Sequence, residues 1–271
     1  MKNRNLFKSF VLGMTFAAVS AFSLTAGAED MTEAETAGQY DDLGYENIMS
    51  ELLSSNVDDF NNLAAGETIE NEISGIKYTV TKPQENIKAI SLELPEGSLN
   101  TNFTSFFCKH GENYMTVQYF TNADGVKTIT VSHIDAETNS ITPIYASTND
   151  DETASYTADL SDYVQGLSGN IEIEATQNED GSVSKVQTIT NDAGEEAAVC
   201  YAEVVTTDEG QDTDVEVTKD GETIATICFQ KTNGDTQTYT VTVEDEDAST
   251  TLTYEVVDGV IDLESATVAD N

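Results

Sequence analysis

The strongest constraint in this sequence is a two-residue alternation of apolar and polar side chains, which runs through most of the chain after residue 76. Near the C-terminus, Tyr239, Val241 and Val243 alternate with threonine and glutamate, and Leu252 and Tyr254 repeat the pattern. Successive side chains of a β-strand point to opposite faces, so this period is typical of strands with one apolar face and one polar face. Because the apolar face must be covered, a flat single layer is excluded.

Short stretches rich in glycine, asparagine and aspartate separate the alternating segments and favour hairpin turns, as at Asp220-Gly221 and Asp258-Gly259. Such short links join antiparallel neighbours, because a parallel crossover needs about a dozen residues or more. The sequence therefore predicts an all-β fold, an antiparallel meander that forms a curved sheet, a sandwich or a half-barrel. The strands expected from the pattern cover residues 76–81, 87–94, 114–121, 126–134, 141–147, 153–160, 170–176, 182–190, 197–207, 213–218, 222–230, 236–244, 250–257 and 260–264.

A different period precedes these strands. Over residues 41–65, Leu43, Ile48, Leu52 and Phe60 recur at helical spacing, and Gly66 follows as a stop signal. This predicts a short amphipathic helical segment, continuous or broken, and a lid formed by it is one of three ways to cover the apolar face, beside a barrel and a sandwich. Residues 29–40 are acidic and aperiodic, which predicts a flexible leader. The β domain then covers residues 66–271, with a candidate sub-boundary near 160–169, where the strand pattern is interrupted.

The first 28 residues have the three parts of a cleavable export signal. Lys2, Arg4 and Lys8 form a basic start, residues 10–22 are largely apolar, and Ala26 and Ala28 supply the small residues that signal peptidase accepts. The apolar stretch is shorter than the roughly 20 residues that cross a bilayer as a helix. We therefore expect cleavage after Ala28 and a secreted, extracellular protein whose mature chain has no transmembrane segment.

The charge balance excludes several kinds of partner. The chain has 50 acidic and 11 basic residues, a formal net charge of −39. Removal of residues 1–28 takes away three basic residues and no acid, so eight lysines, no arginine and a net charge of −42 remain. Nucleic acids and anionic membrane surfaces are bound through lysine and arginine, so neither is an expected partner. Basic surfaces and divalent cations stay open as partners, although solubility alone is a sufficient reason for the charge.

Three cysteines, Cys108, Cys200 and Cys228, are an odd number for an oxidising compartment. Cys200 and Cys228 lie in apolar strand patterns and are expected to be small buried side chains. A disulfide from Cys108 to either of them stays open, because the spacing does not decide. Cys108 also has basic neighbours, Lys109 and His110, of the kind that lower a thiol pKa, which makes it the weak candidate for a catalytic thiol.

No catalytic or cofactor motif stands out. His110 and His133 are the only histidines, too few for a zinc site in a chain without a C-x-x-C pair. Ser105 or Ser132 with either histidine and an acid makes a formal triad. With 50 acids in the chain the third member is always available, so the pattern carries little information, and neither serine lies in a G-x-S-x-G turn. We therefore predict no cofactor and no enzymatic activity, and a secreted hydrolase is the least favoured function.

Calcium is the metal for which the sequence offers some ligands. The loops at 122–125 and 178–181 place an asparagine and an aspartate before a glycine, so Asn122, Asp124, Asn178 and Asp180 are weak candidate ligands. Neither loop matches the twelve-residue EF-hand pattern. The same residue types also make plain hairpin turns, which is the simpler interpretation.

Two functions are favoured by these observations. The first is a secreted, non-catalytic binding protein that contacts another protein or a cell-surface ligand through its sheet or hairpin loops. The second is a carrier of a small apolar ligand or lipid, held against a concave apolar face under the helical segment. An open face lined by Ile, Val, Phe and Tyr would support the carrier, and a filled interior would exclude it.

Overall fold

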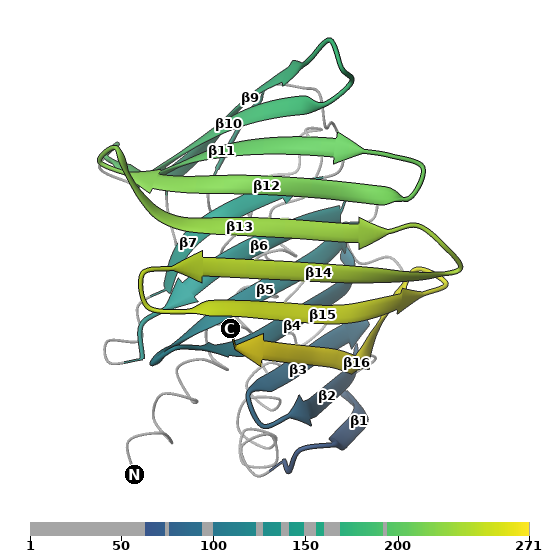
Figure 1. Ribbon diagram of the computed structural model, residues 1–271. Helices are drawn as coiled ribbons and strands as arrows, with labels where there is room; N and C mark the ends of the chain where they lie inside the picture. Colours follow the sequence, from purple (N-terminus) through teal and green to yellow (C-terminus); the bar gives the residue numbers. More distant parts are fainter. Residues whose placement is uncertain are drawn as a thin grey trace, which may run out of the picture.

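The computed structural model describes residues 63–73, 76–93, 100–122, 127–136, 141–148, 156–159, 169–191 and 194–270. All regular structure in these residues is β-strand, arranged in two antiparallel sheets that lie face to face (Figure 1). Sheet A consists of β1 (Glu67–Ile73), β2 (Ile76–Gln84), β3 (Ile87–Glu93), β4 (Asn100–His110), β5 (Asn113–Asn122), β6 (Lys127–Ile134) and β7 (Ile141–Thr148). Sheet B consists of β8 (Tyr156–Asp159), β9 (Gly169–Gln177), β10 (Val183–Asn191), β11 (Glu196–Thr206), β12 (Gly210–Lys219), β13 (Glu222–Thr232), β14 (Thr236–Asp245), β15 (Ser249–Val257) and β16 (Val260–Asp270).

Both sheets are meanders, in which each strand pairs with its neighbours in the sequence. This confirms the predicted all-β antiparallel fold and shows that it is built from two layers. The turns read from the sequence have the expected backbone: φ is +53° at Asp220 and +80° at Gly221, and +51° at Asp258 and +81° at Gly259. Positive φ at both central residues matches the twist of the flanking strands, and aspartate and glycine tolerate it.

Each segment predicted as a strand forms one, but the alternation missed β1 and β4. β1 is rich in acids, and β4 has five consecutive buried residues, 104–108, because both faces of sheet A are buried there. The predicted signal, the leader and the helical segment at 41–65 lie outside the described residues, except that 63–65 lead into β1 without a helix. Residues 160–168 of the candidate sub-boundary also lie outside them. No helix among the described residues is long and apolar enough to cross a membrane.

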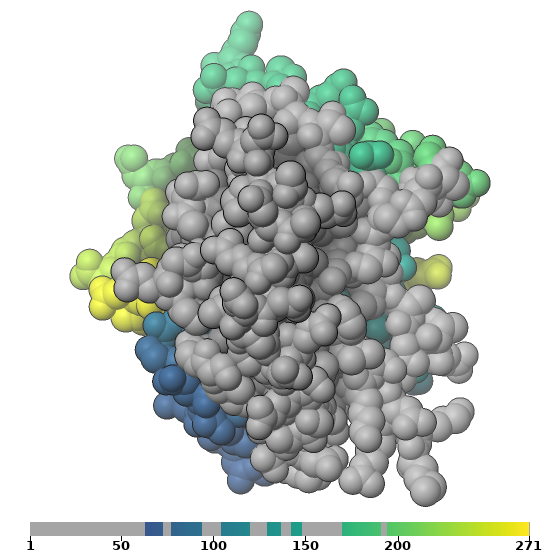
Figure 2. Space-filling view, turned by 180° about the vertical axis from the view of Figure 1, so that it is seen from behind, coloured from purple at the N-terminus to yellow at the C-terminus, as the bar shows by residue number. Residues whose placement is uncertain are grey.

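The hydrophobic core lies between the inner faces of the two sheets. On sheet A, Ala89, Phe106, Val117 and Val131 are successive partners across β3 to β6, and all four are buried. Valine, isoleucine and leucine side chains of sheet B complete the same cluster. β16 lies against β2 and β3, and β11 lies against β7, so the β9–β10 end of sheet B extends past sheet A at the top of the molecule (Figure 1, Figure 2). Both sheets therefore share one hydrophobic core.

Side-chain amides from one sheet cap the edge strand of the other. Gln187 of β10 bonds the backbone of Ala146 on β7 twice: its Oε1 accepts from the Ala146 amide at 3.3 Å, and its Nε2 donates to the Ala146 carbonyl at 2.5 Å. At the opposite edge, Gln84 Oε1 accepts from the Val268 amide at 3.1 Å, and Asn86 Nδ2 donates to the Val268 carbonyl at 3.4 Å. These bonds occupy backbone groups that would otherwise be free to pair with another strand.

Replacing Gln187 with leucine removes both bonds to Ala146 while keeping the size of the side chain. The amide and carbonyl of Ala146 then lack partners in a buried setting, so we expect the free energy of unfolding to fall by about 2 kcal/mol. Urea denaturation followed by circular dichroism measures this loss. Gln230→Leu, at an exposed position of β13, is the control and should cost less than about 0.5 kcal/mol. Equal losses in the two variants would show that the edge cap contributes nothing.

Candidate ligand-binding cavity

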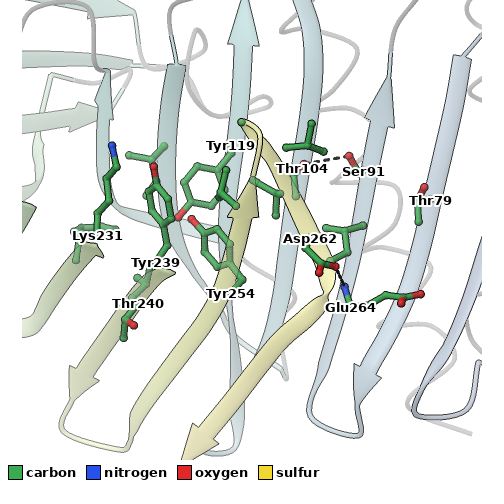
Figure 3. Close-up of a pocket in the computed structure, with 18 of the residues that line it drawn as sticks. Thr79, Ser91, Thr104, Tyr119, Lys231, Tyr239, Thr240, Tyr254, Asp262 and Glu264 are labelled. Atoms are coloured by element: carbon green, nitrogen blue, oxygen red, sulfur yellow. Dashed lines mark hydrogen bonds between the residues drawn. The ribbon is translucent and has the colours of Figure 1, made fainter. Parts of the chain in front are cut away.

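A cavity of about 1440 Å³ lies between the two sheets, at the end of the sandwich where β14 begins and β15 ends. Residues from the inner faces of both sheets line it, and Figure 3 shows several of them. It begins one register step beyond the row of Ala89, Phe106, Val117 and Val131 that fills the core. The two sheets are therefore packed together over part of their length and separated at this end.

Sheet A lines the cavity with a row of mainly hydroxyl side chains. The row crosses six strands through successive register partners: Thr79, Ser91, Thr104, Tyr119, Ile129 and Ser147. The hydroxyl oxygens of Ser91 and Thr104 lie 3.2 Å apart, within hydrogen-bonding distance. Because this row is one step of about 7 Å from the apolar core row, the wall changes from apolar to polar at the point where the sheets separate.

Sheet B lines the cavity mainly with aromatic and aliphatic side chains. Val204, Thr213, Phe229 and Val241 are successive partners across β11 to β14. One step nearer the opening, Tyr239 of β14 pairs with Tyr254 of β15. A molecule in the cavity would therefore meet a polar wall on one side and a largely apolar wall on the other.

Stacked aromatic rings connect the two walls. The Tyr254 ring stacks on Phe106 of sheet A, with centroids 4.8 Å apart, and on Tyr239, with centroids 5.4 Å apart. Tyr119 packs edge-on against Tyr254 at 5.6 Å. The hydroxyls of Tyr119 and Tyr254 point toward one another (Figure 3), but the Tyr119 oxygen has no hydrogen bond of good geometry with the described residues. Burial raises the pKa of both tyrosines above the usual range, so both stay neutral at ordinary pH.

Charged side chains lie on either side of this tyrosine cluster. Lys231 of β13 is on one side, with its Nζ 5.7 Å from the centroid of the Tyr239 ring, and Asp262 and Glu264 of β16 are on the other (Figure 3). Glu264 Oε1 accepts a hydrogen bond from the Thr68 hydroxyl at 2.9 Å. The cavity is thus polarised, with a lysine toward β13 and carboxylates toward β16.

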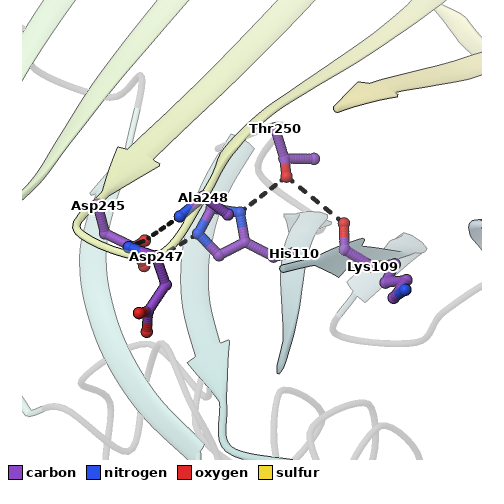
Figure 4. A network of polar contacts seen from close by, with 6 residues as sticks. All are labelled: Lys109, His110, Asp245, Asp247, Ala248 and Thr250. Atoms are coloured by element: carbon purple, nitrogen blue, oxygen red, sulfur yellow. Dashed lines mark hydrogen bonds and ion pairs between the residues drawn. The ribbon is translucent and has the colours of Figure 1, made fainter. Parts of the chain in front are cut away.

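At the opposite end of the sheets, His110 joins β4 to the turn between β14 and β15 (Figure 4). Its Nε2 lies 2.9 Å from Asp245 Oδ2, and its Nδ1 lies 2.8 Å from Thr250 Oγ1. A carboxylate only accepts, so Nε2 carries a proton. Asp245 Oδ1 accepts from the amides of Asp247 and Ala248, both at 2.9 Å. His110 and Thr250 are almost fully buried, and neither lines the cavity, so this network has the character of a structural clamp.

The structure does not bring together the triads that the sequence allowed. Ser105 pairs with Gln118 and Ser132 pairs with Thr116, so both serines point to the face of sheet A opposite His110 and His133. The His110 and His133 rings are neighbours, with centroids 6.1 Å apart. The histidine that does meet an acid has a buried threonine, not a serine, as its other partner.

The three cysteines are free. Burial, reinforced by the charge of Asp270, raises the pKa of Cys108 well above the usual range, and burial raises the pKa of Cys200 to about 12. Burial together with Asp214 raises the pKa of Cys228 to about 11. A nucleophilic thiol needs the opposite shift, so the geometry gives Cys108 no support as a catalytic residue.

The candidate calcium ligands fall on two different sheets. Asn122 ends β5, and Asp124 lies outside the described residues. In the β9–β10 turn, Asp180 Oδ1 accepts from the Ser182 hydroxyl at 2.7 Å and from its amide at 3.0 Å, which lowers the pKa of Asp180, while Asn178 Nδ2 donates to the Ser182 hydroxyl. These side chains are used to shape a hairpin turn. Within the described ranges, no three His, Cys, Asp or Glu side chains are grouped to hold a metal ion.

No known protein family matches this chain, and neither a curated protein nor a solved structure is significantly similar to it. The chemistry of the site is therefore inferred from its geometry. Sequence reasoning did not identify the cavity residues, because Thr79, Ser91 and Thr104 have the hydroxyl side chains that the pattern assigns to solvent-facing positions. Only the register across β2, β3 and β4 reveals that they share one inner wall.

The clamp at Asp245 leads to a prediction about acid stability. Burial by itself would raise the pKa of Asp245, but the bonds from Asp247, His110 and Ala248 outweigh it, and the pKa is lowered. Such a carboxylate stabilises the fold above its unfolded pKa, near 4, and loses that contribution as pH falls through the folded pKa. We expect Asp245→Asn to cost about 1–3 kcal/mol at pH 5, and the difference from wild type to shrink at pH 3.

Urea titrations of the wild type and Asp245→Asn at pH 5 and pH 3 measure this difference. The contributions of the other carboxyl groups to the pH dependence cancel, because both proteins contain them. Asp235→Asn, in the exposed turn between β13 and β14, is the matched control and should show little difference at either pH. The same cost for Asp245→Asn at both pH values would contradict a role for its charge.

Proposed function

We propose that this chain is a secreted, non-catalytic binding protein that holds a small apolar or amphipathic molecule between its two sheets. The cavity of about 1440 Å³ carries the proposal. Its volume exceeds the roughly 300–1,000 Å³ of most small-molecule sites, so a ligand of lipid size fits. Export is supported by the charge, apolar stretch and small residues of the first 28 positions.

The lining supports a carrier more than a protein that binds only through its outer loops. Tyr145 of sheet A packs against Phe229 of sheet B, with ring centroids 5.1 Å apart, and Val241 and Tyr254 extend this apolar surface. Burying apolar ligand surface against such side chains contributes about 25 cal/mol per Å² before the costs of association. Hydroxyls on the facing wall would accept or donate hydrogen bonds to polar groups of the same ligand.

The proposal assigns no catalytic step to the cavity. His110 is bonded to Asp245 and Thr250 at the other end of the sheets, and Cys108 is buried with a raised pKa. Of the polar groups that line the cavity, Glu264 accepts a hydrogen bond, the Ser91 and Thr104 hydroxyls lie within hydrogen-bonding distance of each other, Lys77 forms an ion pair and Lys231 lies over a ring. Binding is the activity that this arrangement supports best.

N-phenyl-1-naphthylamine, a neutral probe that fluoresces in apolar surroundings, tests the proposal. We expect saturable binding with one site per wild-type chain. Thr79→Trp places a large ring on the inner wall of sheet A and should reduce the fluorescence increase severalfold. Thr226→Trp, exposed on β13, adds the same ring outside the cavity and should leave the increase unchanged. No saturable signal from the folded wild type, or equal signals from the two variants, would refute the proposal.

A further inference from the structure

The few lysines of the chain are unevenly placed. Eight remain beside 50 acids after removal of residues 1–28, and Lys77, Lys185 and Lys231 line the cavity. Lys77 is exposed and paired with Glu93, with Nζ 3.3 Å from Oε1. Lys185 is buried on the inner face of β10. Three of the eight lysines therefore line one cavity, whose lining also includes the acids Glu70, Glu72, Glu93, Asp262 and Glu264.

Lys231 differs from Lys77 in its surroundings. Its register partners are Gln211 on β12 and Tyr239 on β14, neither of which is a carboxylate. Its ammonium lies over the Tyr239 ring and makes no ion pair with the part of the chain that the structure describes. An aromatic face offsets only part of the hydration that a half-buried ammonium loses. An anion beside Nζ would supply the missing opposite charge.

Two of the carboxylates that line the cavity on the β16 side, Glu264 and Asp262, have hydrogen-bond donors. Glu264 Oε1 accepts from the Thr68 hydroxyl at 2.9 Å, and Asp262 Oδ1 accepts from the Glu264 amide at 3.0 Å. Both residues are exposed at the rim, where water weakens charge interactions. Lys231 is half-buried, so its interaction with an opposite charge is screened less. Between Lys231 and these two carboxylates, the lysine is the charge that water screens less, which favours an anionic ligand group beside it.

We propose that the ligand is an anionic amphiphile, a carboxylate attached to an apolar body, and that Lys231 binds the carboxylate. Phe229 and Val241 lie one register step deeper than Lys231 and Tyr239, and Tyr145 packs on Phe229. The head group therefore lies near the opening and the apolar body points inward. This inference rests on the proposed function, because it assigns the chemistry of the ligand in the same cavity.

Laurate and 1-dodecanol test the inference, because they share a chain length and differ in the head group. Each is titrated against protein loaded with N-phenyl-1-naphthylamine, and displacement of the probe gives a Kd. We expect laurate to displace the probe from the wild type, with a Kd that rises about tenfold or more in Lys231→Met, since one charge-assisted bond is lost. Lys231→Arg keeps the charge and should stay near wild type. The Kd of dodecanol should be unchanged in both variants.

Lys219→Met, at the exposed β12–β13 turn, removes one positive charge away from the cavity and should leave the Kd of laurate unchanged. Circular dichroism verifies that every variant is folded. An equal loss for laurate and dodecanol in Lys231→Met, or no loss for laurate, would overturn the assignment of Lys231. Tighter binding of dodecyltrimethylammonium, lost in Glu264→Gln, would assign the site to cations instead. Failure of the wild type to bind the neutral probe refutes the proposed function itself. This result is distinguishable from the outcomes with laurate, dodecanol and dodecyltrimethylammonium, which all require a protein that binds the probe.

Discussion

The stacking of Phe106 on Tyr254 joins the two sheets at the boundary between the filled core and the cavity. On one side of this contact, apolar rows of both sheets pack together in one cluster. On the other side, the inner row of sheet A changes to hydroxyls, which are small and gain little from being buried against apolar partners. The sheets therefore stay apart there, while the bonds of His110 to Asp245 and Thr250 hold the opposite end closed.

Strong acidity and a sheet-rich fold are compatible because charge and apolar surface are segregated. The outer face of sheet B has acids even at directly opposed positions, such as Glu203 and Asp214, where like charges cost stability. Together with the amide caps on Ala146 and Val268, this face discourages pairing with other strands. Lys231 is an exception to the segregation, a charge on the inner face. The outer face of sheet B is thus acidic, whereas its inner face holds lysine side chains at the cavity.

The strands, their antiparallel order and their turns could be predicted from the sequence, because alternation and hairpin residues are local signals. β4 could not, since burial on both faces removes the alternation on which the prediction depends, and β1 could not, since it is acidic and only Ile69 and Ile73 in it are apolar. The contact of His110 with Asp245 joins residues 135 positions apart and leaves no local trace. The cavity depends on strand register and on how the two sheets face each other. Lys231 and Thr104 have the polar side chains of solvent-facing residues, and only the packing of the two sheets shows that both line the same cavity.

The central claim is that the separated end of the sandwich binds an amphiphile with its charged group outward. A crystal structure of the protein with 11-bromoundecanoate tests it directly, because bromine gives an anomalous signal that marks the apolar end of the ligand. The account predicts a bromine peak between the sheets beside Phe229 and Tyr145, with the carboxylate at Lys231. A peak only on the outer surface, or a reversed ligand with bromine at the opening, would contradict it.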